Sequence, residues 1–339
     1  MIPHNKPTLG KEEEDAALRV IRSNQLSQDN EVESFENEFC KFIGLPNEHA
    51  VAVSNGSSAL YLALWSLNAN GQKIAFPSYV CSALRNAIGM IGGKEFFVDN
   101  NKNSPNLNLK TIKNQSVDVA IIPHMFGIPL EVNCSDKLKI IEDCAQSLGA
   151  KINDKYVGTL GDVGIFSFYA TKLMTTSGQG GMFVSKNKEL VDKVRDYRQF
   201  DYRKDKKLRF NFQMTEIQAA IGRTQLKKLP SFLKRREEIF HKYKKSGINL
   251  LDTNPENTQI QPVRYRAIMI TDEQSKILSK LNSENITAVI PIEEWELLKQ
   301  DIDLLPNAME FSKKTISLPI YPSLTDDEID LIISCITKK

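Results

Sequence analysis

The chain has 339 residues, and its 44 basic and 42 acidic side chains leave a formal net charge of only +2. This balance gives no electrostatic reason to expect nucleic acid or an anionic membrane as a partner, and no apolar run is long enough to cross a bilayer. Five cysteines without paired spacing, four scattered histidines and no secretory signal argue against a disulfide framework, a metal site and export. The sequence therefore predicts a cytoplasmic protein with one large domain or two.

The amino-terminal part alternates predicted helices and strands. Amphipathic patterns predict helices over 10–23 and 33–43, and a short apolar run predicts a buried strand over 50–53. A small polar turn then leads into a predicted helix over 59–67. Strand, polar turn and helix form a phosphate-binding arrangement, because free N–H groups and the helix dipole point at an anion. An ordinary capped helix start is the alternative for this segment alone.

Further short apolar runs predict strands over 73–76, 95–99, 117–123 and 138–141. Helical candidates lie between several of them, as over 81–89. Strands that alternate with helices in this way are typical of an α/β fold whose mainly parallel sheet is covered on both faces.

The strand over 138–141 runs into two acids, Glu142 and Asp143. Ligands of open α/β sheets bind outside the carboxyl ends of the strands. Asp143 is therefore well placed to meet a positively charged group of a bound ligand, and Gln146 to reach the same ligand from the following turn. The alternative is a pair of acids that begins a helix and interacts favourably with its dipole.

The segment from Gly164 to Val184 holds an apolar run, Ile165 to Tyr169, and soon afterwards Lys172. Hydroxyl side chains, three glycines and a second apolar run follow. A lysine just past a buried strand, with glycines that let the backbone bend, suits a Schiff-base amine. Desolvation beside apolar groups favours the neutral amine that this chemistry needs. Taken alone, the segment favours the alternative of a surface lysine in a hairpin loop, which the local sequence does not overturn.

Together these segments resemble the DegT/StrS family of pyridoxal phosphate-dependent sugar aminotransferases. The matching segments are Glu142-Asp-Cys-Ala-Gln-Ser147, Gly161-Asp-Val-Gly-Ile-Phe-Ser-Phe168 followed by Lys172, and Gly178-Gln-Gly-Gly181. The resemblance extends over nearly the whole chain. It implies the type I fold of such aminotransferases, with a large domain over 1–235, built on a mixed, mostly parallel sheet, and a smaller α+β domain over 236–339.

The resemblance also implies the role of each residue at the cofactor. Lys172 would hold the cofactor and move the proton, Asp143 would stabilise the protonated ring, and Gln146 would hold the phenolic oxygen. Three residues would bind the phosphate: Gly56, Ser57 and Ser167.

Two positions near the predicted cofactor site either depart from the family or allow more than one role. Cys81 stands where the family usually has an aromatic residue that stacks on the ring, with Tyr79 two residues earlier. His124 matches a family His-x-x-Gly segment after a strand, and it either lines the pocket or serves the structure.

After the lysine, the pattern predicts a helix over 188–199 and then a charged loop over 200–209. Such a charge run is usually a solvated face. In the family, however, this loop crosses a dimer interface, and the asparagine that matches Asn211 contacts the neighbouring subunit's cofactor phosphate. The resemblance therefore implies a homodimer with shared active sites.

The carboxyl-terminal part is predicted as a second set of helices and strands. One helix is expected over 215–229, another begins at Pro230 and runs to about 245, and a capping box at Thr325 begins the last helix. Between them the pattern predicts a strand over 264–271, a helix over 272–285 and a short strand over 287–292. This part is shorter than in the family: Val289 to Trp295 stands where His-containing segments are usual.

The implied reaction moves an amino group from an amino-acid donor, usually L-glutamate, to a nucleotide-linked keto-deoxysugar for surface polysaccharide or a glycoconjugate. Two alternatives stay open. A sugar dehydratase on the same scaffold would carry histidine in place of Lys172, which counts against it. A non-catalytic or regulatory relative is compatible with the shortened carboxyl-terminal part and with Cys81.

Overall fold

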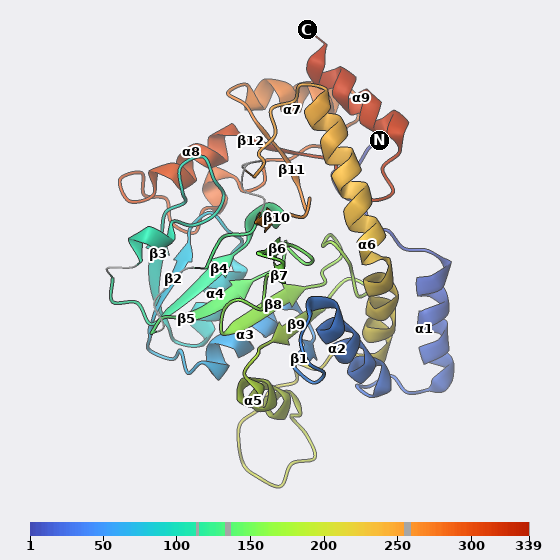
Figure 1. The fold of residues 1–339 in the computed structure, drawn as a ribbon, viewed down its shortest axis with the longest axis vertical. Coiled ribbons are helices and arrows are strands. Elements are labelled where there is room, and N and C mark those ends of the chain that lie inside the picture. Colours follow the sequence, from blue (N-terminus) through green and yellow to red (C-terminus); the bar gives the residue numbers. More distant parts are fainter. Residues whose placement is uncertain (113–114, 133–136, 254–258, 339) are drawn as a thin grey trace.

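The computed structural model describes residues 1–112, 115–132, 137–253 and 259–338. A seven-stranded sheet lies at its centre (Figure 1). Across the sheet the strands are β1 (Ala50–Val53), β9 (Gly181–Val184), β8 (Val163–Ser167), β5 (Lys139–Asp143), β4 (Val119–Pro123), β2 (Lys73–Pro77) and β3 (Lys94–Val98). Only β9 runs against its neighbours, pairing antiparallel with β1 and β8. The predicted mostly parallel α/β sheet is confirmed.

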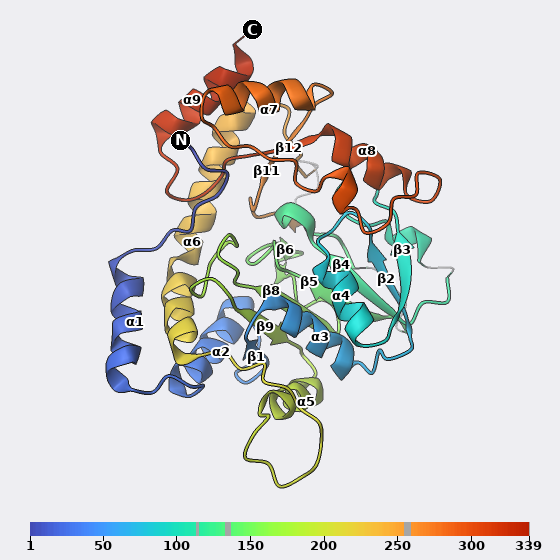
Figure 2. The same cartoon turned by 180° about the vertical axis from the view of Figure 1, so that it is seen from behind.

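Helices cover both faces of this sheet, as the sequence predicts. On the face toward the viewer in Figure 2 lie α3 (Gly56–Ser66) and α4 (Ala83–Met90). On the opposite face lies α2 (Asn30–Ile43), while α5 (Lys188–Arg198) lies near one end. The alternation along β1 divides the core accordingly. Val51 and Val53 pack in the cluster that holds Leu60 of α3, whereas Ala50 and Ala52 pack in the one that holds Phe39 of α2.

One long helix connects the sheet to the carboxyl-terminal part. Two helices divided at Pro230 were expected, but α6 runs unbroken from Glu216 to Lys245 with that proline inside it. Pro230 is exposed, so its ring lies off the packed face of the helix, which continues past it with one backbone hydrogen bond fewer. A capping box at Thr215 starts the helix, and α1 (Lys11–Ser23) packs along it.

The carboxyl-terminal part has its own small sheet, in which β11 (Ala267–Ile270) pairs antiparallel with β12 (Thr315–Leu318). Three helices accompany it: α7 (Gln274–Ser283), α8 (Pro306–Lys314) and α9 (Asp326–Thr337). The capping box at Thr325 is confirmed. The strand expected over 287–292 is wrong: only Val289 pairs, in a single bridge with Ser317, because the chain there crosses the edge of the small sheet without following it.

Some short elements carry too little periodicity to be predicted. These are β6 (Lys151–Ile152), β7 (Lys155–Tyr156) and β10 (Ile260–Gln261), which pair with one another. The amino terminus returns to the carboxyl-terminal part, where Ile2 bridges Ile286 (Figure 1). Among the described residues, no helix combines the length and apolar character that crossing a bilayer requires. The division into domains 1–235 and 236–339 stays a prediction.

Candidate active site

A cavity of about 250 Å³ lies at the carboxyl ends of the central strands. β5 ends at Asp143, β8 ends at Ser167, and β1 leads into α3, so residues from three strands converge at one edge. Six of the predicted site residues line this cavity: Gly56, Ser57, Cys81, Asp143, Ser167 and Lys172. Segments far apart in the sequence therefore meet as the motifs predicted.

The amino terminus of α3 forms one end of the cavity. Asn55 caps the helix, and its side chain accepts a hydrogen bond from the Ser58 N–H at 2.8 Å. Gly56 lies so close to β8 that an added Cβ would be only 2.8 Å from the Cβ of Ser167. The close approach brings the N–H groups at the helix start and the hydroxyls of Ser57 and Ser167 to one place, which suits a phosphate group.

Asp143 supplies the carboxylate of the cavity. The residue is 7% exposed, and one of its oxygens accepts a hydrogen bond from the Ala145 N–H at 3.0 Å. Burial raises the pKa of this carboxyl group, while the Ala145 N–H and the charge of Lys172 act in the opposite direction. A cationic ligand that met this carboxylate would therefore be bound favourably.

Lys172 lies in the loop between β8 and β9, and backbone hydrogen bonds close this loop. The N–H of Ala170 donates to the Gly178 carbonyl at 3.1 Å, and Gly178 has a φ of +111°, which favours glycine. The amino-terminal segment also contacts the loop, because Asn5 Nδ2 donates a hydrogen bond to the Thr171 carbonyl at 2.8 Å. The segment forms a hairpin-like loop, but Lys172 lines the cavity, which the alternative of a simple surface lysine does not predict.

Tyr265, which no sequence motif indicates, lies beside the lysine. The Lys172 Nζ lies 5.4 Å from the centroid of the Tyr265 ring, a cation–π geometry. Burial alone would raise the pKa of this phenol, but nearby positive charges, chiefly that of Lys172, lower it overall. Tyr265 follows no motif and stands far along the chain, just before β11, so only the folded structure identifies it.

Cys81 lines the cavity, as predicted from its place in the sequence. The residue is exposed, but the atoms that surround its thiol partly desolvate it and raise its pKa, and the carboxylate of Asp143 raises it further. The thiol is therefore protonated near neutral pH and presents a small, polarizable, apolar surface. Tyr79 is buried and packs edge-to-face against Phe311, so it takes part in the core.

Two predicted cofactor residues do not line the cavity. The Gln146 Oε1 accepts a hydrogen bond from the Phe126 N–H at 2.8 Å. Asn211 is exposed beyond the charged loop, and its Oδ1 accepts from the Gln213 N–H at 3.1 Å. The roles of Gln146 and Asn211 at the cofactor stay predictions.

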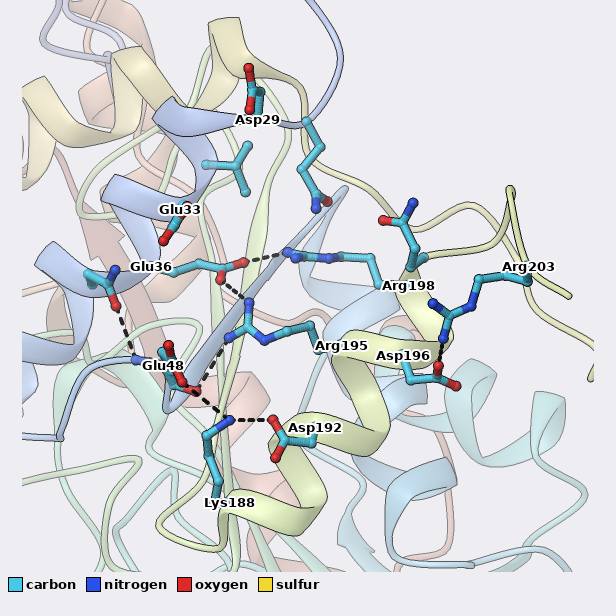
Figure 3. A pocket seen from close by; sticks show the side chains of 14 residues that line it. Asp29, Glu33, Glu36, Glu48, Lys188, Asp192, Arg195, Asp196, Arg198 and Arg203 are labelled. Carbon is cyan, nitrogen blue, oxygen red and sulfur yellow. Dashed lines mark hydrogen bonds and ion pairs between the residues drawn. The ribbon is translucent and has the colours of Figure 1, made fainter. Parts of the chain in front are cut away.

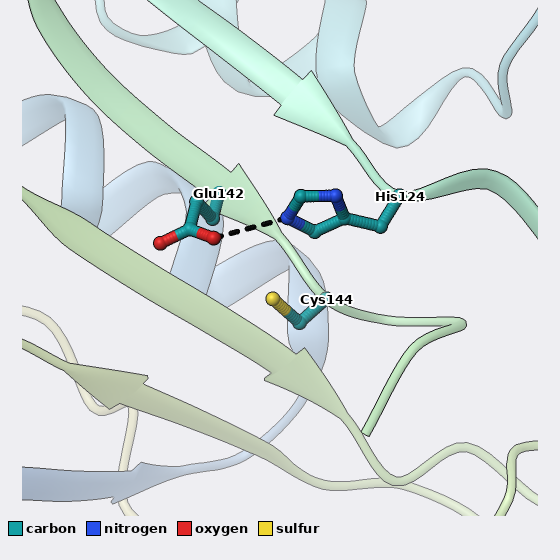
Figure 4. Close-up of side chains that lie close together, drawn as sticks. All are labelled: His124, Glu142 and Cys144. Atoms are coloured by element: carbon teal, nitrogen blue, oxygen red, sulfur yellow. Dashed lines mark hydrogen bonds and ion pairs between the residues drawn. The ribbon is translucent and has the colours of Figure 1, made fainter. Parts of the chain in front are cut away.

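His124, Glu142 and Cys144 lie together, with their potential ligand atoms within 4.8 Å of one another (Figure 4). Their hydrogen bonds indicate a structural cluster. The Leu130 N–H donates to His124 Nδ1 at 3.0 Å, so Nε2 carries the proton and donates to Glu142 at 3.0 Å. Burial raises the pKa of the Cys144 thiol well above its ordinary value, which disfavours the thiolate that metals bind.

Glu142 also accepts three backbone hydrogen bonds, from the N–H groups of Gly158, Leu160 and Gly161. Its two oxygens are thus committed to the loop that precedes β8 and to His124. This arrangement fixes the ends of β4, β5 and β8 relative to one another, and with them the neighbouring Asp143. His124 therefore supports the site from behind and does not line its cavity.

A larger cavity of about 730 Å³ lies elsewhere, beside α2 and α5 (Figure 3). Its floor is an ion-pair network in which Glu36 binds both Arg195 and Arg198. Arg198 also donates to the Ala52 carbonyl at 2.7 Å, so the network ties α2 and α5 to β1. Further acidic and basic side chains line this cavity, and none of the predicted site residues is among them.

A model of the DegT/DnrJ/EryC1/StrS aminotransferase family matches residues 7–337. The chain belongs to this family. The sequence segments that first suggested the family are those that form the cavity, and the predicted aminotransferase class and type I fold are confirmed.

Relatives within the family match over almost their whole length. GDP-perosamine synthase of Escherichia coli O157:H7 is 29% identical over 360 residues, covering 99% of this chain and 98% of the relative. The spore coat polysaccharide biosynthesis protein SpsC of Bacillus subtilis is 29% identical over 380 residues, covering 99% and 96%. The solved structure of Helicobacter pylori PseC, an aminotransferase involved in pseudoaminic acid biosynthesis, superposes with a TM-score of 0.86 at 26% identity, covering 99% and 98%. These relatives do not favour the non-catalytic alternative.

Proposed function

We propose that this protein uses pyridoxal phosphate to transfer an amino group from an amino acid, L-glutamate in the first instance, to a nucleotide-linked keto-deoxysugar. The observation that carries the proposal is that Lys172 and Asp143 line one cavity together with the amino terminus of α3. An amine, a carboxylate and an anion-binding helix terminus are the three features that this cofactor requires.

The residues of the cavity fit the cofactor in both charge and space. Because Gly56 has no Cβ, the start of α3 can lie close to Ser167. The hydroxyl-bearing residues Ser57 and Ser167 both line the cavity there. Asp143 would hold the ring nitrogen, and Cys81 and Ala145 line the same cavity and would contact the ring. When bound, pyridoxal phosphate would supply an electron sink for the charge that develops on the donor carbon.

The chain's own residues would then carry out binding and proton transfer. Lys172 would hold the cofactor covalently and, once released, move a proton at the donor carbon. Asp143 would keep the ring nitrogen protonated. Ser57 and Ser167 would donate hydrogen bonds to the phosphate. Tyr265 would orient the Lys172 amine through the ring contact that the structure contains.

The sugar substrate is inferred from the relatives. One is named for a GDP-linked product and another for polysaccharide biosynthesis. A nucleotide-linked 4-keto-6-deoxyhexose that feeds a surface polysaccharide or glycoconjugate follows by similarity. The proposal includes a homodimer and a cytoplasmic location. A dehydratase is disfavoured because the cavity contains Lys172 and not a histidine.

Replacement of the lysine tests the chemistry directly. The Lys172→Ala variant should lose the visible absorption change that L-glutamate produces in the cofactor-loaded wild-type protein, and its turnover should fall by a factor of at least about 10³, since covalent and general-base catalysis are lost together. Spectrophotometric titration with L-glutamate measures the first, and a transfer assay the second. Lys155→Ala, which changes an exposed lysine outside the cavity, is the matched control.

A panel of nucleotide-linked keto-sugars with ¹⁵N-labelled L-glutamate tests the acceptor class. Incorporation of label into a sugar that Lys172→Ala leaves unlabelled supports the proposal. If the Lys172→Ala variant turned over as fast as the wild-type protein, the catalytic role of Lys172 would be contradicted. If the wild-type protein transferred the amino group to 2-oxo acids alone, the sugar acceptor would be contradicted.

A further inference from the structure

The loop between β8 and β9 brings an aromatic side chain to the cavity as well as its lysine. Tyr169 lines the same cavity as Lys172 and Asp143, and it is the only aromatic residue among the described residues that line it. The residue is 46% exposed, and its phenol hydroxyl has no hydrogen-bond partner among the described residues, whereas its backbone N–H donates to Ser167 Oγ at 3.4 Å. An accessible ring beside a cavity is placed to contact a ligand there.

Gln179 lies directly opposite Tyr169 in this loop. The Phe168 N–H donates to the Gly180 carbonyl at 2.8 Å, which continues the antiparallel register of β8 and β9 beyond their ends. The next pair of residues in this register is Tyr169 and Gln179. Side chains of directly opposite residues lie close together on one face, and both of these residues line the cavity.

The side-chain amide of Gln179 is also available to a ligand. The backbone carbonyl of Gln179 is held by Thr176 Oγ1 at 2.6 Å and by Gln218 Nε2 at 2.9 Å. The side chain is exposed, and its amide has no hydrogen-bond partner within the part of the chain that the structure describes. An amide offers donors and an acceptor together. A ring and an amide side by side suit a sugar, whose C–H groups pack on an aromatic face and whose hydroxyls both donate and accept.

The position of the pair relative to Lys172 indicates which part of a nucleotide-linked sugar it would meet. The Lys172 N–H donates to the Tyr169 carbonyl at 2.9 Å, so a closed turn ties the two residues together. A ligand group on the Tyr169 ring is therefore near the reactive amine. In a nucleotide-linked keto-sugar this group is the hexose, because the nucleoside lies beyond a diphosphate.

The size of the cavity also places the sugar at its exposed side. Its volume is about 250 Å³, below the roughly 300–1,000 Å³ that is usual for pockets of drug-sized ligands. Once the cofactor is bound, little of this space is left for a second ligand. The sugar would then lie where the lining residues are exposed, and these include Tyr169 and Gln179.

On the basis of the proposed function, on which this inference rests, we propose that Tyr169 and Gln179 bind the hexose ring of the nucleotide-linked acceptor. The Tyr169 ring packs against the apolar face of the sugar, and the Gln179 amide forms hydrogen bonds with its hydroxyls. Neither side chain supplies a positive charge for the carboxylates of an amino-acid donor. The pair therefore favours the sugar acceptor and takes no part in proton transfer.

Calorimetric titration of the cofactor-loaded, full-length protein tests this binding without turnover. The probes are GDP-mannose, UDP-N-acetylglucosamine and dTDP-glucose, whose hexose rings carry no keto group, and each is compared with its nucleoside diphosphate alone. The wild-type protein should bind at least one of the three sugar nucleotides. Absence of binding of all three would overturn the proposal.

Tyr169→Ala should weaken the binding of that sugar nucleotide about tenfold, corresponding to about 1.4 kcal/mol, and leave the dissociation constant of its nucleoside diphosphate unchanged. Gln179→Ala should act in the same direction, and Tyr169→Phe, which keeps the ring, should retain most of the affinity. Met90→Ala changes a large exposed side chain of α4 outside the cavity and is the matched control. Unchanged constants in Tyr169→Ala, or equal weakening of both ligands, would overturn the hexose contact.

Half-reaction kinetics separate the hexose contact from the proposed function itself. Tyr169→Ala should react with L-glutamate at the wild-type rate, whereas its KM for the keto-sugar should rise about tenfold with little change in kcat, as expected when binding alone is lost. A wild-type protein that is inert to L-glutamate would contradict the proposed transamination. A wild-type KM for the keto-sugar in Tyr169→Ala would contradict only the hexose contact.

Discussion

The two neighbouring carboxylates at the end of β5 have opposite environments. Burial raises the pKa of both carboxyl groups, but in Glu142 the His124 hydrogen bond and three backbone N–H groups outweigh burial and lower the pKa overall. In Asp143 the single Ala145 hydrogen bond and the charge of Lys172 do not outweigh burial, so the pKa of this carboxyl group is raised overall. The Glu142 carboxylate is therefore fully hydrogen-bonded within the structure, whereas the Asp143 carboxylate is available to a ligand in the cavity.

The stability of the Glu142→Gln variant should reveal this difference. An amide cannot accept all the hydrogen bonds that Glu142 accepts, so the free energy of unfolding at pH 7 should fall by about 3–5 kcal/mol. Because the folded-state pKa is depressed, the stabilisation by Glu142 is present above the ordinary pKa of 4.5 and is lost as the pH falls through the folded-state value. Urea unfolding from pH 7 to pH 3 should therefore show the wild-type and variant curves converging, and a constant difference would contradict this role.

Gly56 offers a second test at the scale of one residue. An added Cβ would lie 2.8 Å from the Ser167 Cβ, so either the start of α3 or the end of β8 must move. Gly56→Ala should weaken cofactor binding at least about tenfold and lower the free energy of unfolding by about 1–3 kcal/mol. Cofactor titration by fluorescence measures the first effect, and urea unfolding the second.

Gly89→Ala is the matched control for Gly56→Ala. Gly89 lies in α4, and an added Cβ there would meet nothing within 4 Å. Alanine should stabilise this helix by about 0.5–1 kcal/mol and leave cofactor affinity unchanged. Equal cofactor affinities in the two variants would contradict the proposed phosphate contact.

Among the elements, α6 contributes to both ends of the molecule. Its first half packs beside α1 and α2, and its second half gives Ile239, Phe240 and Tyr243 to the core that also holds Ile332 of α9. The helix also carries Arg236 between these two regions. Continuity through Pro230 therefore matters, because a break there would uncouple the sheet from the carboxyl-terminal part.

Pro230→Ala should raise the free energy of unfolding by about 1–3 kcal/mol, since alanine restores a backbone donor to an exposed helix interior. Urea unfolding measures this change, with Ser231→Ala at the next exposed position as control. A loss of stability in Pro230→Ala would mean instead that packing at the two ends of α6 depends on a bend that the proline provides.

At the scale of the whole molecule, the loop between α5 and α6 projects away from the rest of the chain (Figures 1 and 2). It exposes large apolar side chains, with Tyr202 95%, Leu208 87% and Phe210 61% exposed. Exposed apolar side chains on a projecting loop suit contact with a partner. This feature supports the prediction that Asn211, at the end of the loop, serves the active site of a second copy.

Subunit mixing tests the shared site. Lys172→Ala and Asn211→Ala should each be impaired as homodimers, but their co-expressed heterodimer would contain one site with wild-type residues at both positions. Activity should therefore return to about half of the wild-type value per dimer. If each site were built from one chain, the heterodimer would show no more activity than the average of the two variants.

The sequence by itself determined the order of the elements, the α/β class and the residues of the motifs. Lys172, Asp143 and Ser167 could be selected because the chemistry of strand ends and glycine turns is local, and local patterns are visible along the chain. The continuous course of α6 could not be predicted from the sequence. A proline inside a helix is tolerated where its ring points away from the core, and which face of α6 packs against the core is decided only by the fold.

The tertiary structure alone decided which distant side chains surround those residues. Tyr265 contacts Lys172 across the fold, Arg236 is buried without an acid, and Gln146 bonds to the Phe126 backbone. None of these contacts leaves a periodic or motif signal, because each depends on how separate segments pack. The amine of Lys172 was recognisable in the sequence, but its surroundings on both sides exist only in the folded chain.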